Sequence, residues 1–389
     1  MAITKWTGVE VKTIRVDALR VTQRELAEIL GVSEGVVQKW EQRGPTITLA
    51  GAFAAAMDTL YERLTDAQRD RVGPAMRPET PRGGSDQLSD AIAARMPVLR
   101  QVLDRHDLPE DGPVRGIDEL EQIVDAVVEY RLNSDYLRLL CELPSVLPEL
   151  HRARSSFGGF AQERVNALLA QAYRAADAVA DKFGYADLSS RIIDMMRDAA
   201  KRAGDEVLLA ASAYVRTELF FRSRQHAMGR KLLELAADEV DPSRSVGDAA
   251  AFGSLHMRAA VVAARDFRSV EARAHLSEAD RVASRVPESV YAGTAFGPES
   301  VRIHRVSLAV ELGDIGAALA EARDWRPSPG QVPAERCSHF YIDVARAHLL
   351  GGDHEGAMAA LYSAHSVAPQ HTHSHPFVTD MLAQLGGWR

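Results

Sequence analysis

The sequence predicts an all-α protein with two parts, a small N-terminal helical domain and a long C-terminal array of helical hairpins. Residues 21–43 contain two short helix patterns separated only by a tight turn. From residue 88 onward, apolar residues keep helical spacing with almost no strand-like alternation. Paired helix patterns recur there at intervals of roughly 35–45 residues. We therefore expect a domain at 1–72, called the head, a linker at 73–87 and a body at 88–389.

The first helix of the head is predicted at residues 9–20. Its apolar positions at helical spacing are Val9, Ile14, Val16 and Leu19. Arg15 and Arg20 fall between them, so we expect both side chains to face outward.

Residues 21–43 carry the start and stop signals of two more helices. Thr22 is a good N-cap with Glu25 as its capping-box partner, and Gly31 lies where a helix ends in a left-handed residue. Ser33 is expected to cap the second helix. The predicted inward-facing residues are Leu26, Ala27, Ile29 and Leu30 in the first helix, and Val36, Val37 and Trp40 in the second.

The short turn between these helices points to DNA recognition. Because only three residues separate them, the helices must cross steeply and leave a polar outer face on the second. This geometry places a recognition helix in the major groove, so a double-stranded DNA operator is the expected partner. The expected DNA-contacting residues are Gln23, Arg24, Ser33, Glu34, Gly35, Gln38, Lys39 and Arg43. Gln23 would touch a phosphate, whereas Gln38 and Lys39 would reach the bases.

The same residues resemble the Xre, or lambda-repressor-like, helix-turn-helix family. The family pattern Gln-x-x-Leu-Ala-x-x-Leu-Gly-Val-Ser-x-x-x-Val-x-x-Trp-Glu is matched by Gln23, Leu26, Ala27, Leu30, Gly31, Val32, Ser33, Val37, Trp40 and Glu41. Gly35 departs from the family, which usually carries a base-contacting side chain there. A glycine removes one contact and weakens the helix by up to ~1 kcal/mol relative to alanine.

The rest of the head and the linker follow from spacing and composition. Apolar residues at helical spacing after Pro45 predict helices that close the head core, and these residues are Leu49, Phe53, Met57, Leu60, Tyr61 and Leu64. Prolines and glycines then interrupt every periodic pattern over residues 73–86, which indicates a linker.

The body is predicted to consist of stacked helical hairpins. The pairs are 117–131 with 134–153, 160–180 with 184–203, 205–222 with 224–240, 248–264 with 268–286, 298–312 with 314–324, and 334–350 with 353–368. Small residues on the second helices allow close approach. The last two pairs resemble degenerate tetratricopeptide repeats, which implies an α-solenoid, and 375–385 would be a closing helix.

Composition bounds the class of protein. The chain of 389 residues has a net charge of −8, but its first fifty residues carry seven basic and six acidic side chains. A weakly basic head on an acidic body suits DNA binding through the head alone. No apolar stretch approaches the ~18–20 residues that a bilayer requires. Cys141 and Cys337 lie far apart, so we expect a reducing, cytoplasmic location without disulfides or a membrane partner.

The sequence contains no phosphate loop, nucleophile elbow or paired carboxylates that would indicate an enzyme, and we expect no cofactor. His371, His373 and His375 alternate with Thr and Ser, and could ligate a transition metal in an extended segment. Because no Cys or acidic residue accompanies them, no metal site is predicted, and the sequence leaves their role open.

An effector site is expected on the concave side of the array, which the first helices of stacked pairs line. A small molecule or peptide would contact their outward polar and aromatic side chains. These candidates are Asn166, Arg174, Tyr214, Glu218, Phe252, His256, His304, His339, Phe340 and Asp343.

A helix-turn-helix head on a helical-repeat body resembles a class of bacterial regulators that includes pheromone-responsive peptide receptors. Residues 296–304 are similar to a segment recurrent in that class, with Ser300 where Asn often stands. The resemblance implies a sequence-specific transcription regulator that acts as a homodimer and senses an effector. Two alternatives stay open, a protein–protein interaction scaffold and an antitoxin-type autoregulator.

Overall fold

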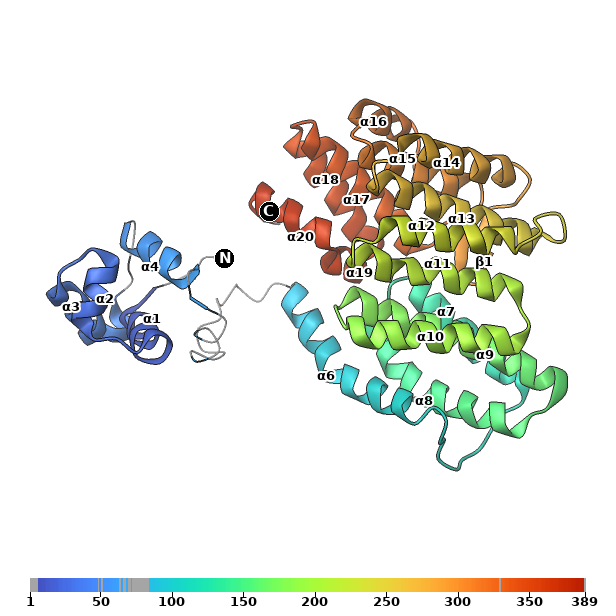
Figure 1. The fold of residues 1–389 in the computed structure, drawn as a ribbon, viewed down its shortest axis with the longest axis horizontal. Helices are drawn as coiled ribbons and strands as arrows, with labels where there is room; N and C mark the ends of the chain where they lie inside the picture. The colour runs from blue at the N-terminus through green and yellow to red at the C-terminus, as the bar shows by residue number, and fades with distance from the viewer. Residues whose placement is uncertain are drawn as a thin grey trace. The chain divides into compact units, whose positions relative to one another are not determined.

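The computed structural model describes residues 6–47, 49, 52–62, 64, 65, 68, 71, 84–328 and 330–387. The chain forms two compact units, Met1–Gly83 and Gly84–Arg389. The described residues are almost entirely helical, which confirms the all-α class (Figure 1). Among them, no helix combines the length and apolar character needed to span a bilayer. Cys141 is an exposed free thiol and Cys337 a buried one.

The N-terminal unit contains the helices expected for the head. They are α1 (Gly8–Thr13), a π-helical segment (Ile14–Leu19), α2 (Gln23–Leu30), α3 (Glu34–Arg43), a short 3-10 helix (Gly44–Thr46) and α4 (Ala52–Glu62). Their shared core consists of Trp6, Val11, Ile14, Ala18, Leu26, Ala27, Val37, Trp40, Leu49, Met57 and Leu64. Gly8 has a special role, because a Cβ there would lie 1.9 Å from the Trp40 carbonyl oxygen. α1 therefore packs directly on the backbone of α3.

Several apolar residues expected inside the head are exposed instead. Val9 and Val16 are exposed because α1 buries Gly8 and Val11, and the π-helical segment rotates the following positions off an α-helical face. Ile29 is 53% exposed, since Leu26 and Ala27 form the buried face of α2. Phe53 is also largely exposed, although its ring packs edge-on against Trp40.

The second unit, called the body from here on, begins before position 88. α6 starts at Gly84. The sequence did not predict this start, because the first turn, Gly-Ser-Asp-Gln, is polar and shows no apolar periodicity. The rest of the linker expected at 73–87, namely residues 73–83, lies outside the described residues.

The helices of the body follow the predicted pairs to within a few residues. They are α6 (Gly84–Asp104), α7 (Ile117–Leu132), α8 (Tyr136–Ser156), α9 (Gly159–Lys182), α10 (Ala186–Ala203), α11 (Glu206–Arg222), α12 (His226–Asp238), α13 (Val246–Arg265), α14 (Ser269–Ala283), α15 (Pro298–Glu311), α16 (Ile315–Arg323), α17 (Ala334–Leu350), α18 (His354–Val367), α19 (Pro369–Ser374) and α20 (Pro376–Leu385). Asp N-caps begin several of them, at Asp135, Asp205, Asp314 and Asp353.

The helices of the body stack into two layers. From α7 to α18 each helix contacts the next, and α7, α9, α11, α13, α15 and α17 also contact one another in succession (Figure 1). These odd-numbered helices form the inner layer. Apolar clusters fill the space between the layers along the whole array.

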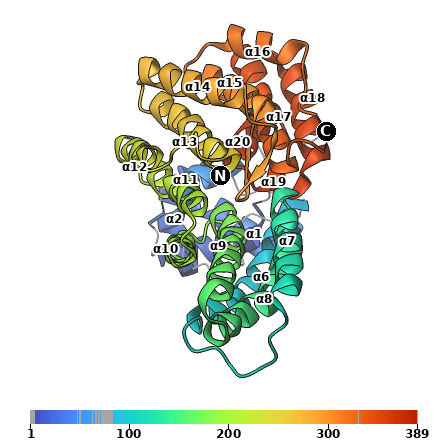
Figure 2. The same cartoon turned by 90° about the vertical axis from the view of Figure 1, so that its right-hand side faces the viewer.

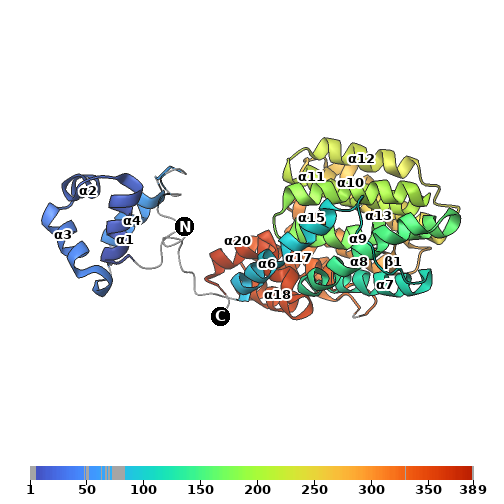
Figure 3. The same ribbon diagram turned by 90° about the horizontal axis from the view of Figure 1, so that it is seen from below.

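The two ends of the array meet. α19 contacts α6. Figures 2 and 3 show the body from two further sides, with the C-terminal helices in red and α6 in blue-green. The Gln370 side chain of α19 also contacts the start of α8. Its Oε1 accepts from the Leu137 backbone N–H at 3.2 Å, and its Nε2 donates to Asp135 at 3.2 Å. The inner layer consequently encloses a central space.

One antiparallel hairpin interrupts the helices between α14 and α15. Its strands are β1 (Ser289–Tyr291) and β2 (Thr294–Phe296), with Val290 opposite Ala295. The turn residues Ala292 and Gly293 both have positive φ, 45° and 75°. The sequence did not predict this hairpin, because three-residue strands are too short to show an alternating pattern.

Candidate functional site

The outer face of α3 is the first candidate site. Val37 and Trp40 are buried, whereas Glu34, Gly35, Gln38, Lys39 and Arg43 are exposed on the same helix. The turn before it forms as expected, with Gly31 at a φ of 68°. Ser33 occupies the N-cap position, but its side chain makes no capping hydrogen bond, so its hydroxyl is not committed to α3.

The predicted side-chain contacts of α2 are partly confirmed. Thr22 and Glu25 form the expected capping box, with the Glu25 carboxylate accepting from the Thr22 backbone N–H at 2.7 Å. Arg24 pairs with Glu28 at 3.3 Å, and because both side chains are exposed the pair contributes little to stability.

A partly buried ion pair links α3 to the preceding helices. The Arg15 guanidinium donates to both Glu41 carboxylate oxygens, at 2.6 and 2.9 Å, and the Gln23 amide donates to the same carboxylate at 2.7 Å. Burial alone would raise the pKa of Glu41, but the hydrogen bonds from Arg15 and Gln23 lower it. The expectation that Arg15 faces outward was wrong, because its partner lies 26 residues away in the sequence.

Gln38 and Lys39 have no hydrogen-bond or ion-pair partner among the described residues. A Cβ at Gly35 would meet nothing within 4 Å, so packing inside the unit does not require glycine there. The outer face of α3 is therefore polar and exposed, and the opposite face of the helix packs into the apolar core of the head.

A central cavity in the body is the second candidate site. Its volume is about 420 Å³, and its walls come from the inner helices, the β1–β2 turn and the start of α20. Six predicted effector residues line it: Arg174, Tyr214, Glu218, His304, His339 and Asp343.

Other predicted effector residues do not line this cavity. Asn166 is buried and donates to the Gln162 carbonyl at 2.8 Å, and Phe340 belongs to the apolar core. Phe252 and His256 pack together on the side of α13 that faces α14, where His256 meets His275 at 3.0 Å. These four residues lie outside the cavity because sequence spacing indicates a shared helix face without identifying the neighbour that this face meets.

Charged groups on one wall of the cavity are tightly balanced. Glu335 lies 3.7 Å from Arg131 and 3.8 Å from Lys182. Although burial would raise the pKa of Glu335, the positive charge of Lys182, together with that of Arg131, lowers it to about 2. Further along α17, Arg346 pairs with Glu311 at 3.0 Å and Asp343 at 2.8 Å.

Two guanidinium groups that line the same cavity lack an acidic partner among the described residues. Arg174 donates to the Ala292 carbonyl at 2.7 Å, and burial, followed by the like charge of Arg131, lowers its pKa to about 9. Arg336 lies 3.1 Å from His304 Nε2 and 3.5 Å from the Tyr214 hydroxyl. Buried charges without a counter-charge are costly, so this part of the cavity favours an anion.

Several residues that line the cavity were not predicted from the sequence. The missed residues are Arg131, Lys182, Arg258, Gly293, Glu335 and Arg336. Ser300, by contrast, is fully buried and donates to Glu288, so it does not face the cavity.

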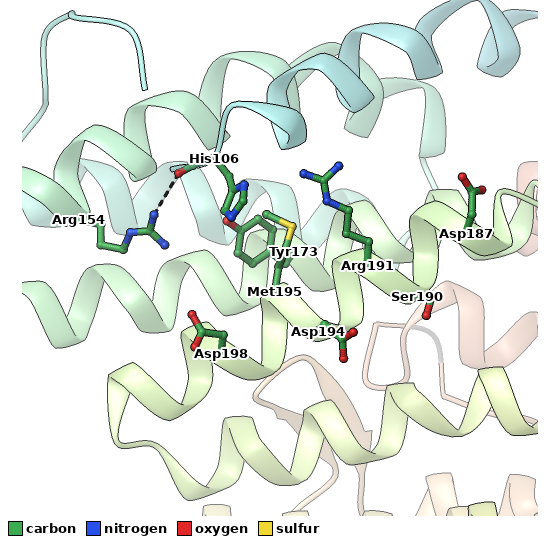
Figure 4. Close-up of a pocket in the computed structure, with 9 residues that line it drawn as sticks. All are labelled: His106, Arg154, Tyr173, Asp187, Ser190, Arg191, Asp194, Met195 and Asp198. Atoms are coloured by element: carbon green, nitrogen blue, oxygen red, sulfur yellow. Dashed lines mark hydrogen bonds between the residues drawn. The ribbon is translucent and has the colours of Figure 1, made fainter. Parts of the chain in front are cut away.

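A larger hollow of about 540 Å³ lies on the outside of the body (Figure 4). Arg154 donates there to the His106 carbonyl at 3.0 Å, and Arg191 to the Leu103 carbonyl at 2.8 Å. Asp187, Asp194 and Asp198 are exposed to solvent. The charged groups of this outer hollow are thus hydrogen-bonded within the body or exposed to water. The smaller central cavity is therefore the better candidate for a ligand.

Comparison of the chain with protein-family models, curated proteins and solved structures finds no match in any of the three.

Proposed function

We propose that this protein is a sequence-specific DNA-binding transcription regulator that acts as a homodimer and holds an effector in the body cavity. The observation that carries the proposal is the outer face of α3, where Gln38 and Lys39 project from a helix fixed by a buried core and by the Arg15–Glu41 pair. Side chains held in this way can reach base edges in a major groove. Gly35 suits a close approach of the α3 backbone to DNA.

Two heads per operator follow from charge. Neutralised phosphates supply most of the affinity of such proteins, and the first fifty residues have only one basic residue in excess. A single head consequently binds weakly, whereas a dimer can occupy two half-sites about one helical turn apart.

The effector we propose is a small molecule or short peptide with an acidic group. The cavity volume of about 420 Å³ lies within the usual range of about 300–1,000 Å³ for ligand sites. Arg174 and Arg336 supply positive charge without an acidic partner, and the Tyr214 hydroxyl lies beside them. A carboxylate or phosphate there would replace the missing counter-charge.

A mobility-shift assay with genomic fragments, followed by footprinting, tests the proposal. The full chain should protect a discrete palindromic site and should prefer it over random DNA as salt rises. Lys39→Ala should weaken binding to that site by roughly 1–3 kcal/mol if Lys39 contacts a base. Lys231→Ala removes the same charge from an exposed position on α12 and should leave binding unchanged.

The alternatives give different results in the same assay. Salt-sensitive binding to any DNA, equally strong for Lys39→Ala, would favour the scaffold and argue against a sequence-specific regulator. A footprint confined to the promoter of the protein's own operon would favour the autoregulator.

A further inference from the structure

Three histidine side chains from separate elements converge beside the central cavity. His339 lies on α17, His371 on α19, and His375 at the N-cap of α20. One nitrogen of each lies within 4.8 Å of the others. The ring centroids of His339 and His371 are 4.5 Å apart, and those of His371 and His375 are 5.4 Å apart.

Two nitrogens in this cluster lack a partner although they are buried. His371 Nε2 and His375 Nδ1 have no hydrogen bond. The other nitrogen of the His371 ring lies 3.0 Å from the Ser338 hydroxyl, which also contacts the Thr372 hydroxyl at 3.1 Å. Buried polar atoms normally have partners, so two unpaired nitrogens in one cluster call for an explanation.

The imidazoles are in the protonation state that binds metals. Burial is the largest cause that lowers the pKa of all three, and it lowers that of His371 to about 3. The rings are therefore neutral at neutral pH, with a lone pair free on one nitrogen of each. A hydrogen bond from the second ring nitrogen, as at His371, is the usual support of a metal-bound histidine.

We propose that His339, His371 and His375 bind one divalent transition metal ion of the zinc class. Three imidazole nitrogens around such an ion lie about 3.3 Å apart at the normal bond length of about 2.0–2.1 Å. The nitrogens, within 4.8 Å of one another here, would have to move closer to the ion by rotation of the side chains. His339 and His375 also line the cavity, so the fourth coordination position faces its interior and can take water or an acidic group.

The position of the site gives the ion a structural effect. It would join α17 to α19 and to the N-cap of α20. His371 follows Gln370, whose side chain holds the two ends of the array together. Lys182 lies near the cluster, but the Glu335 carboxylate balances its charge at 3.8 Å. Metal binding is therefore expected to stabilise the closed array.

The test uses the full chain, stripped of metal with a chelator and titrated with Co²⁺, then with Zn²⁺. Wild type should bind one Co²⁺ per chain, develop visible absorption bands of a tetrahedral site, and lose them when Zn²⁺ is added. Its melting temperature should rise with either ion, because only the folded chain presents the three ligands together.

Variants separate this site from other histidines. His339→Gln and His375→Gln should each weaken metal binding at least tenfold and abolish the bands, as expected when one of three ligands is lost. His348→Gln is the matched control, since this partly exposed residue lies on the same helix α17, away from the cluster, and contacts Asp353. It should bind as wild type does. Melting of each metal-free variant checks that it is folded.

A wild-type chain without Co²⁺ bands and without a melting shift would overturn the proposal. So would folded His339→Gln and His375→Gln variants that bind the ion as tightly as wild type. The result does not depend on DNA binding, so failure of the metal site and failure of the proposed function are distinguishable.

Discussion

At the scale of single residues, the body buries carboxylates whose protonation depends on their surroundings. Asp177 is 3% exposed and lines the cavity, where it accepts a hydrogen bond from the Ser189 hydroxyl at 2.7 Å. Burial raises its pKa to about 7. Arg15 and Glu41 illustrate the opposite case, in which a partly buried pair keeps both charges. A nearby counter-charge thus decides whether burial neutralises a group.

Asp177 makes stability depend on pH. The folded state holds the Asp177 proton up to about pH 7, whereas an unfolded aspartate loses it near its ordinary pKa of 3.8. The folded chain therefore binds more protons across this window, and this contribution to stability falls as pH rises through it. Asp177→Asn keeps the shape and the acceptor for Ser189, but has no proton to lose.

We predict that Asp177→Asn gains stability over wild type as pH rises from 5 to 8, by roughly 1–4 kcal/mol. Chemical denaturation at several pH values measures the difference. Asp194, on the neighbouring helix α10, is exposed, so Asp194→Asn serves as the control. The difference in stability between this variant and wild type should be the same at pH 5 and at pH 8. An Asp177→Asn effect that does not change with pH would contradict the assignment.

At the scale of elements, the β1–β2 hairpin shapes the effector site. Its turn presents the Ala292 and Gly293 carbonyls to Arg174 and Arg131. Gly293 has a φ of 75°, and a Cβ there would lie 3.1 Å from Arg131 Nη2. The turn consequently requires glycine for two reasons, its backbone conformation and the close guanidinium.

These reasons can be separated by two alanine substitutions. Gly313 also has a φ of 75°, but a Cβ there would meet nothing within 4 Å. Gly313→Ala should cost only the left-handed strain, about 1–2 kcal/mol. Gly293→Ala should cost more, because Arg131 must also move. Thermal unfolding of both variants measures this, and equal losses would show that the turn does not constrain the guanidinium.

Elements with strong local signals were predictable, whereas contacts between them were not. The capping box at Thr22, the turn glycine Gly31 and the Asp N-caps appear in the sequence, and the helix bounds followed from them. The Arg131–Glu335 contact joins the first and last inner helices across the central space. No local pattern encodes such a pair, so only six of the residues that line the cavity were anticipated as effector contacts.

At the scale of the whole molecule, the proposed regulation links two separate units. Each has its own core, and the linker expected between them is rich in proline and glycine. Under the proposal, a linker of this composition would transmit little torque. An effector in the body would therefore act by changing the spacing of the two heads of a dimer. Loss of the second half-site can weaken binding by about two orders of magnitude without altering a head residue.

Selection of DNA duplexes by the full chain from a random library tests the central claim most directly. We predict enrichment of a palindrome whose half-sites lie about one turn apart, and a loss of about 100-fold in affinity when about five base pairs are inserted between them. A library that yields no common sequence, or an enriched site whose affinity ignores this insertion, would contradict the account of a dimeric, sequence-specific regulator.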